Sequence, residues 1–114
     1  MKIQEVARIL EAKVLCGEDK LEMVLDYAFA SDLMSDVLTT QAENMVLLTG
    51  LSNVQAIRTA EMSDINCLII VRDKTVTPDM VELAKEGDIV LLKCSFSMFK
   101  AAGLLYKHGL KAIF

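Results

Sequence analysis

The sequence predicts an α/β fold in which a mostly parallel β-sheet is flanked by helices. Short apolar runs alternate along the chain with stretches of helical spacing, as is typical of parallel strands joined by crossover helices. Three runs, residues 45–48, 67–71 and 89–92, contain no charged residue, as expected of strands covered on both faces. No linker, low-complexity stretch or charge block divides the chain, so we expect a single domain over residues 1–114.

The first thirty residues predict one helix and two strands. Apolar residues recur at helical spacing over residues 3–10, which indicates a short amphipathic helix. A strand over residues 12–15 ends before Gly17. Residues 23–30 are apolar and rich in strand-forming side chains, with Asp26 as their one charge, so they predict a second strand.

A second helix is expected directly after residue 30. Ser31 or Asp32 can act as its N-cap, because short polar side chains accept hydrogen bonds from the free N–H groups of a helix start. Its predicted buried face consists of apolar residues at helical spacing: Leu33, Met34, Val37 and Leu38.

Start and stop signals predict the third and fourth helices. Ser52 and Gln55 have the spacing of a capping box. Thr77 followed by Pro78 reads as an N-cap with proline at the first helical position, and Gly87 supplies the stop. The third helix is expected to bury one face: Val54, Ile57 and Ala60.

A fifth helix and a closing strand complete the predicted order. Ser95 or Ser97 begins the helix, and Gly109 ends it. Residues 111–114 form a short last strand. Three residues lie on one side of this helix: Phe99, Ala102 and Tyr106.

Charge and cysteine usage exclude several function classes. The net charge is −4 and the basic residues occur singly, so the basic cluster of a nucleic-acid-binding protein is missing. Cys16, Cys67 and Cys94 lack metal-ligand spacing, and we predict inert buried thiols and no metal site. No apolar run approaches the roughly 18 residues of a spanning helix, and no signal-peptide pattern opens the chain. We therefore expect a cytoplasmic protein that does not bind membranes.

Polar turns follow the predicted strands and define a candidate ligand site. The carboxyl ends of parallel strands share one edge of a sheet, where ligands bind. Residues 31–32, 49–53, 72–77 and 94–97 must meet there, and each leads into a helix N-terminus. The candidate ligand-binding residues are Thr49, Gly50, Leu51, Ser52, Asn53, Thr75 and Ser95.

The turn of residues 49–53 is the best candidate for binding an anion. Gly50 permits close approach of the backbone, Thr49 and Ser52 offer hydroxyls, and the turn contains no acidic residue. The alternative is that Gly50 only permits a tight turn and Ser52 only caps a helix. The turn is not a P-loop, because the glycine run and its lysine are absent.

No catalytic constellation is evident. His108 has no serine or cysteine nucleophile at a suitable position and reads as a helix C-terminal cap. Asp32 and Asp36 read as the acidic first turn of a helix rather than a Mg²⁺ site. Arg58 and Glu61 either pair on a helix surface, or Arg58 reaches a carboxylate of a partner chain. We therefore predict no enzyme activity and no cofactor.

Three segments in this order resemble the DRTGG-domain family of clostridia-like anaerobic bacteria: residues 32–38 (DLMSDVL), 47–51 (LLTGL) and 58–62 (RTAEM). The resemblance covers nearly the whole chain, although Leu51 stands where the family has a second glycine. Relatives of this domain occur beside CBS domains in regulated pyrophosphatases and within phosphotransacetylases. The implied fold is a three-layer sandwich like the N-terminal domains of HPr kinase and MurF.

The resemblance implies a non-catalytic regulatory or dimerisation module. Such a module senses a small anionic ligand or docks a partner protein, in a setting linked to anaerobic redox or hydrogenase metabolism. The alternative is an adenine-nucleotide sensor whose Thr49 to Asn53 turn cradles phosphate. We expect a homodimer, with these candidate interface residues: Asp32, Ser35, Asp36, Arg58 and Glu61.

Overall fold

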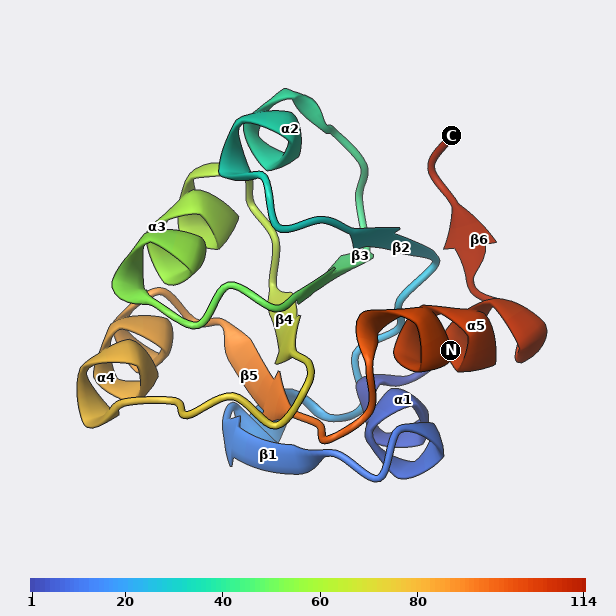
Figure 1. Ribbon diagram of the computed structural model, residues 1–114, viewed down its shortest axis with the longest axis horizontal. Coiled ribbons are helices and arrows are strands. Elements are labelled where there is room, and N and C mark those ends of the chain that lie inside the picture. The colour runs from blue at the N-terminus through green and yellow to red at the C-terminus, as the bar shows by residue number, and fades with distance from the viewer.

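A single sheet lies at the centre of the computed structural model, which describes residues 1–114 (Figure 1). Its strands are β1 (Lys13–Cys16), β2 (Tyr27–Ala30), β3 (Met45–Thr49), β4 (Cys67–Ile70), β5 (Val90–Lys93) and β6 (Lys111–Ala112). They lie in the order β1-β5-β4-β3-β2-β6. All neighbours pair in parallel except β1, which runs antiparallel to β5. The predicted α/β class with a mostly parallel sheet is confirmed.

Helices cover both faces of the sheet. They are α1 (Ile3–Ile9), α2 (Met34–Thr39), α3 (Val54–Met62), α4 (Pro78–Glu86) and α5 (Met98–Lys107), with a 3₁₀ turn η1 at Glu18–Lys20. Figure 1 shows α2, α3 and α4 on one side of the sheet and α1 and α5 on the other. None of these helices has the length and apolar character needed to cross a membrane.

The side chains of the central strands alternate between two apolar cores. On β3, Met45 and Leu47 face α2, α3 and α4, whereas Val46 and Leu48 face α1 and α5. Each core contains 15 buried residues, so neither face is left polar. This two-sided burial is the reason that β3, β4 and β5 read as continuous apolar runs in the sequence.

The run predicted as a strand over residues 23–30 divides into two parts. Only its second half, β2, joins the parallel sheet. The first half pairs with the N-terminus: the Leu25 N–H donates to the Met1 carbonyl oxygen at 2.7 Å, and the Ile3 N–H donates to Met23 at 2.9 Å. Backbone partners, rather than side-chain pattern, decide where this strand begins.

The N-cap of α3 differs from the prediction. Asn53 Oδ1 accepts the hydrogen bond of the Ala56 N–H at 3.0 Å, so the capping box of Ser52 and Gln55 does not form. The Ser52 hydroxyl donates instead to the carbonyl oxygen of Thr75 and joins two neighbouring turns. The predicted caps Thr77 for α4 and Ser97 for α5 are confirmed.

The predictions for α2 were partly wrong. Leu33 stands at the N-cap position, and no side chain caps this helix. Ser31 Oγ accepts only from the Leu33 N–H, at 3.0 Å, and Asp32 bonds elsewhere. Met34 and Val37 are buried, but Leu33 and Leu38 are exposed, because a helix of six residues presents only a short face to the sheet.

Each of the five α-helices is followed, before the next strand, by one residue in the left-handed conformation. Gly87, the predicted stop of α4, has φ −88° as the C-cap, and Asp88 after it has φ 57°. Position 87 favours glycine because of space rather than φ, since a Cβ there would lie 2.9 Å from a carboxylate oxygen of Glu61. The predicted stop Gly109 has φ 109°. Positive φ also occurs at Glu11, Asn44 and Asp64, each of which lies in the turn that leads from a helix to the next strand.

Candidate functional site

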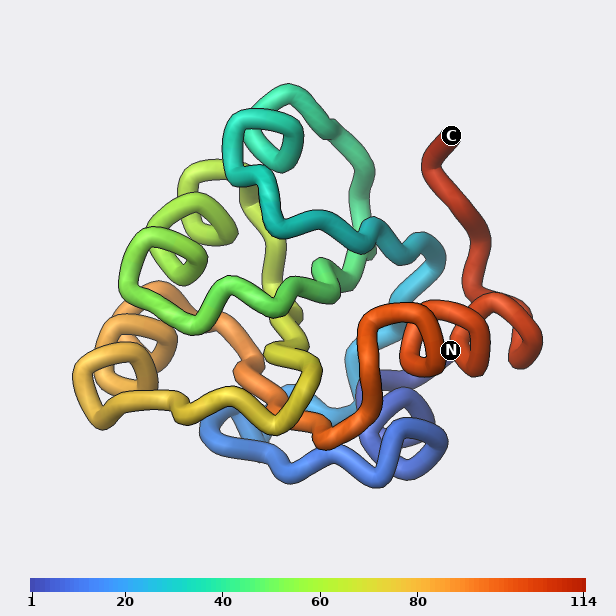
Figure 2. The backbone as a smooth tube through the Cα atoms, in the orientation of Figure 1, coloured from blue at the N-terminus to red at the C-terminus, as the bar shows by residue number.

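The predicted polar turns do meet at the carboxyl edge of the parallel strands, which faces the reader in Figure 1. Backbone hydrogen bonds join them in succession. The Ser31 N–H donates to Leu48, at the end of β3, at 3.0 Å, and the Arg72 N–H donates to Phe96 at 2.8 Å. The tube in Figure 2 shows the loops that follow β3, β4 and β5 side by side at this edge. We call this surface the carboxyl rim.

A carboxylate occupies the turn that the sequence proposes for an anion. Asp32 Oδ1 accepts from the Gly50 N–H at 2.6 Å and from the Thr49 hydroxyl at 3.1 Å. The Leu51 N–H donates in turn to Thr49 Oγ1 at 3.1 Å. The turn itself contains no acidic residue, but a carboxylate from another rim segment occupies it. Asp32 comes from the preceding βα connection, and the parallel register of Ala30 with Leu48 brings it here.

The guanidinium group of Arg72 lies next to Gly50 as well. A Cβ placed on Gly50 would lie 3.2 Å from Nη2 and 3.4 Å from Nε of Arg72, and 3.4 Å from Asp32 Oδ1. Arg72 is exposed, has φ 65°, and forms no ion pair within 4.0 Å. The turn thus presents an anionic and a cationic group, both held against a residue without a side chain. Arg72 was in a predicted rim segment, but we did not single it out.

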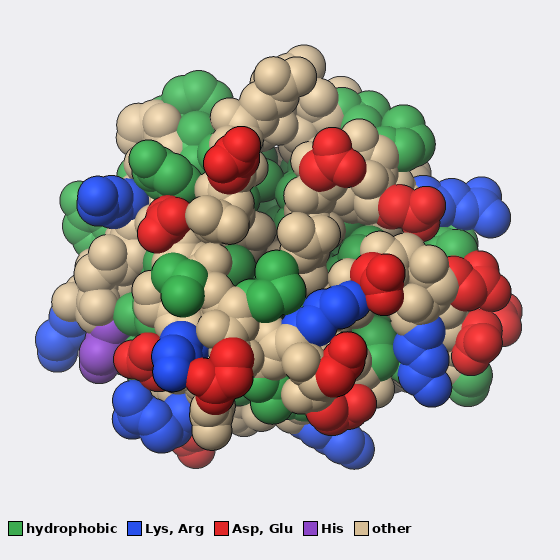
Figure 3. Space-filling model, turned by 180° about the vertical axis from the view of Figure 1, so that it is seen from behind, with side chains coloured by type: hydrophobic (Ala, Val, Ile, Leu, Met, Phe, Trp, Pro, Cys, Tyr) green, Lys and Arg blue, Asp and Glu red, His purple; other side chains and the backbone are tan.

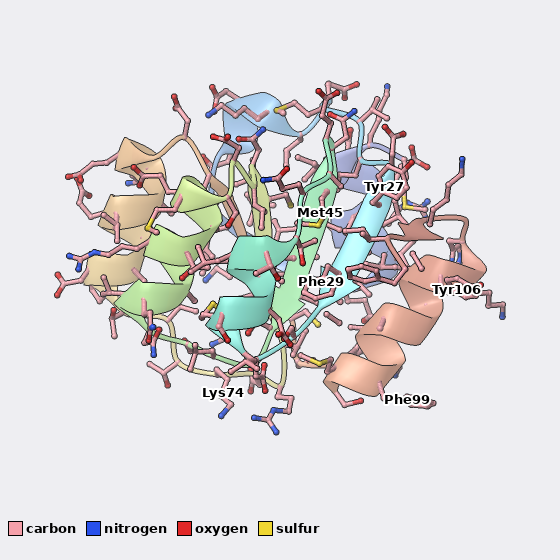
Figure 4. All side chains as sticks on the ribbon, turned by 90° about the horizontal axis from the view of Figure 1, so that it is seen from above. Tyr27, Phe29, Met45, Lys74, Phe99 and Tyr106 are labelled. Atoms are coloured by element: carbon pink, nitrogen blue, oxygen red, sulfur yellow. The ribbon has the colours of Figure 1, made fainter.

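The other candidate ligand residues also lie on the rim, and some of their side chains already form hydrogen bonds within the protein. Ser52 donates to the Thr75 carbonyl oxygen, and Asn53 caps α3. Ser95 is exposed in the turn before α5, next to the Phe96 carbonyl that receives the Arg72 N–H. Figure 4 shows Lys74 at this edge as well, and this side chain is half-buried. The rim therefore offers Arg72 and Lys74 as cations near the Gly50 turn.

The candidate interface residues belong to the turn before α2 and to the neighbouring helices α2 and α3. Ser35 and Asp36 are exposed on α2, and Arg58 is exposed on α3. Of the two alternatives for Arg58 and Glu61, the surface pair does not form: Glu61 is turned toward Gly87, and no ion pair joins it to Arg58 within 4.0 Å. Arg58 instead lines a shallow groove together with acidic residues of α4: Asp79, Glu82 and Glu86.

All three cysteines are free and buried in this fold. Complete burial raises the pKa of Cys67 to about 12, and burial also raises the pKa of Cys16 and of Cys94 above the usual value. Their thiolate forms are disfavoured, as predicted for core residues. No three His, Cys, Asp or Glu side chains are grouped as ligands of a metal ion would be. His108 Nδ1 lies 2.8 Å from the Leu104 carbonyl oxygen, near the C-terminus of α5.

The face opposite the rim shows no large patch of one charge. Seen from behind, basic and acidic side chains alternate over the molecule (Figure 3).

Comparison with known proteins gives one family and one informative structure. The model of the DRTGG domain matches residues 5–107. A solved structure of the CBS and DRTGG domains of the regulatory region of Clostridium perfringens pyrophosphatase, complexed with the activator diadenosine tetraphosphate, is similar with a TM-score of 0.73 and 13% identity. The similarity covers 96% of this chain and 50% of that one, so this chain spans half of that structure. No curated protein shows significant sequence similarity.

Proposed function

This chain belongs to the DRTGG-domain family, and from that premise we propose that it is a non-catalytic regulatory module whose carboxyl rim binds a small anionic effector. An adenine nucleotide is the first effector to test, because the similar pyrophosphatase region is complexed with a dinucleotide activator. In that protein the DRTGG domain is part of a regulatory region.

The observation that carries the proposal is the pair of Arg72 and Asp32 at Gly50. A guanidinium group presents a planar fork of N–H donors that matches phosphate oxygens. Asp32 supplies an acceptor for a hydroxyl or amino group of the same ligand. A nucleotide carries both kinds of group, whereas a simple anion carries only one. The absence of a side chain at Gly50 leaves room for close approach between them.

Asp32 also lowers the affinity of this site for simple anions. Its carboxylate already holds the Gly50 N–H and the Thr49 hydroxyl, so a phosphate must displace it or bind beside it at Arg72. Repulsion from this carboxylate lowers the affinity for phosphate alone. Replacing Asp32 by asparagine keeps a side-chain acceptor for these donors and removes the charge. Asp32→Asn is therefore expected to bind inorganic pyrophosphate more tightly than the native chain.

Thermal unfolding with added AMP, ATP or diadenosine tetraphosphate tests the proposal. A nucleotide at one hundred times its dissociation constant stabilises a protein by about 2.7 kcal/mol. Arg72→Ala is expected to abolish this gain, and Arg72→Lys to retain only part of it, because an ammonium group cannot bind phosphate through two parallel bonds. Arg8→Ala is the matched control, since Arg8 is an exposed arginine of α1 and belongs to none of the rim turns. An unchanged melting temperature with every nucleotide, or equal binding by Arg72→Ala, contradicts the proposal.

Self-association is a second proposal for this module. The support is the set of exposed residues of opposite charge on α2 and α3, where Arg58 of one copy can meet Asp36 of another. Sedimentation velocity is expected to show a dimer that Arg58→Glu dissociates. A monomer at every concentration would remove this part and leave the effector site to be judged separately.

A further inference from the structure

One face of the sheet is left open between α5 and the β6 edge. An apolar groove of about 330 Å³ lies there, which we call the α5–β6 groove. Its floor includes Ala28 and Ala30 of β2 and Ala112 of β6. The opposite face carries three helices, but this face carries only α1 and α5 (Figure 1). The place of a third helix is vacant, and alanine side chains on the floor let a helix approach closely.

The wall of the groove is a second apolar stripe on α5. Ala101 and Leu105 form the buried stripe of this helix. Phe99 and Tyr106 project from another side, as Figure 4 shows, and are 90% and 71% exposed. Together with Ala102 and Gly103, which also line the groove, they have the i, i+3, i+4, i+7 spacing of a helix covered on two sides. Two large exposed aromatic rings beside an apolar groove indicate a surface for protein contact.

Lys111 is the one charged residue among those that line the groove, and its positive charge indicates the kind of partner. Residues 89–114 contain four lysines and no acidic residue, while residues 1–88 have a net charge of −8. Lys111 lines the groove, and Lys100 and Lys107 belong to the same helix. A second copy seated symmetrically would bring these lysines against each other, because a two-fold contact joins the same patch of both chains. An acidic occupant meets no such repulsion.

We propose that the α5–β6 groove docks an amphipathic helix of a partner protein, with apolar residues in the groove and acidic residues flanking them. Its apolar side chains pack between the alanine floor and the rings of Phe99 and Tyr106. Its carboxylates lie near Lys107 and Lys111. This mode of binding is that of a helix laid into a hydrophobic groove. None of the residues that line the groove belongs to the turn of residues 49–53, and neither Asp32 nor Arg72 lines it, so the partner and the effector occupy different sites.

A pair of synthetic peptides tests this assignment on the intact chain. The first is an alanine-based peptide of about 18 residues, long enough to be helical in water, with leucines at i, i+3, i+4 and i+7 and glutamates beside them. The second carries lysines in place of the glutamates. The acidic peptide is expected to bind about tenfold more tightly at low salt, and to lose this advantage as salt is added. Its amide chemical-shift changes are expected on α5, β2 and β6.

Two variants locate the contact. A Cβ added at Gly103 meets no atom within 4 Å, so a side chain can start from this exposed position without a clash. Gly103→Leu is therefore expected to fold, to occupy part of the groove and to abolish binding, and circular dichroism checks that it is folded. The double variant Lys107→Glu, Lys111→Glu is expected to prefer the basic peptide. Met62→Ser is the matched control, since Met62 is an exposed hydrophobic residue on α3, across the sheet.

Four results with the peptides overturn the proposal. They are equal affinity for both peptides, no binding of the acidic peptide at millimolar concentration, shift changes outside the groove, and unchanged binding by folded Gly103→Leu. A dimer in sedimentation velocity that Gly103→Leu dissociates also overturns it, because the occupant is then a second copy.

Discussion

The two faces of the sheet bury cores of equal size, yet they are covered to different extents. Each face has a core of 15 buried residues, drawn both from the strands and from the segments that cover them. On one face, α2, α3 and α4 extend over the sheet, and even Phe29 of β2 is half-buried there. On the other face, α5 is the last helix before the β6 edge, and Ala30 and Ala112 beyond it are exposed. The number of helices on a face, rather than the apolar content of the strands, decides how much of that face is covered near the β6 edge.

Truncating adjacent leucines of β3 is the strongest test of this comparison. Leu47 faces the three helices and Leu48 lines the α5–β6 groove, although both are completely buried. Leu47→Ala is expected to lower the free energy of unfolding by about 4 kcal/mol, and Leu48→Ala by about 2–3 kcal/mol, because the space it leaves opens into the groove. Urea denaturation measures both. Equal losses would show that the two faces are packed with the same tightness.

The pH dependence of stability tests whether the uncovered part of the two-helix face extends from the α5–β6 groove as far as β4. Cys67 belongs to the core of the two-helix face, but burial raises its pKa from the ordinary value of 9.0 to about 12. Folding therefore favours the protonated thiol. This stability is complete below pH 9 and is lost as the pH rises toward 12, by about 2 kcal/mol at pH 10.5.

Urea midpoints between pH 8 and 10.5 measure the loss, with Cys67→Ala as the control that lacks the titrating thiol. If the native chain and Cys67→Ala lose stability in parallel, water reaches β4 and the open region is wider than the α5–β6 groove.

The helix caps give the smallest expected effect and should not distinguish the faces. Asn53 caps α3 and Ser97 caps α5, each through one side-chain acceptor. Replacing either by alanine is expected to cost about 1 kcal/mol, whereas Ser95→Ala, in the turn before α5, is expected to change little. Thermal unfolding measures all three. A much larger loss for one cap would mean that its helix contributes more to its face than the packing indicates.

The sequence predicted what depends on local pattern. Continuous apolar runs identified β3, β4 and β5, and the polar turns after them identified the carboxyl rim. The antiparallel place of β1 beside β5 was not predicted, because nothing in residues 13–16 specifies a partner strand far along the chain. The Ser52 cap was misassigned because Asn53, one residue later, satisfies the same helix end.

The candidate site was predictable as a place but not as a set of contacts. Asp32 reaches the Gly50 turn through the register of β2 with β3, and Arg72 reaches it from the loop after β4. Both contacts depend on the order of strands in the sheet, which periodicity does not encode. Residues that follow strands in different βα units have to be considered together if such pairs are to be found from sequence.

The left-handed residues between helices and strands restrict how this chain can change in length. Asp64 is followed directly by buried Ile65, and Asp88 by buried Ile89. Adding or deleting one residue at either turn would exchange the two faces of the next strand. Insertions and deletions are therefore expected to be tolerated poorly at this end of the molecule, and length variation among relatives should concentrate at the opposite end, where loops precede the helices.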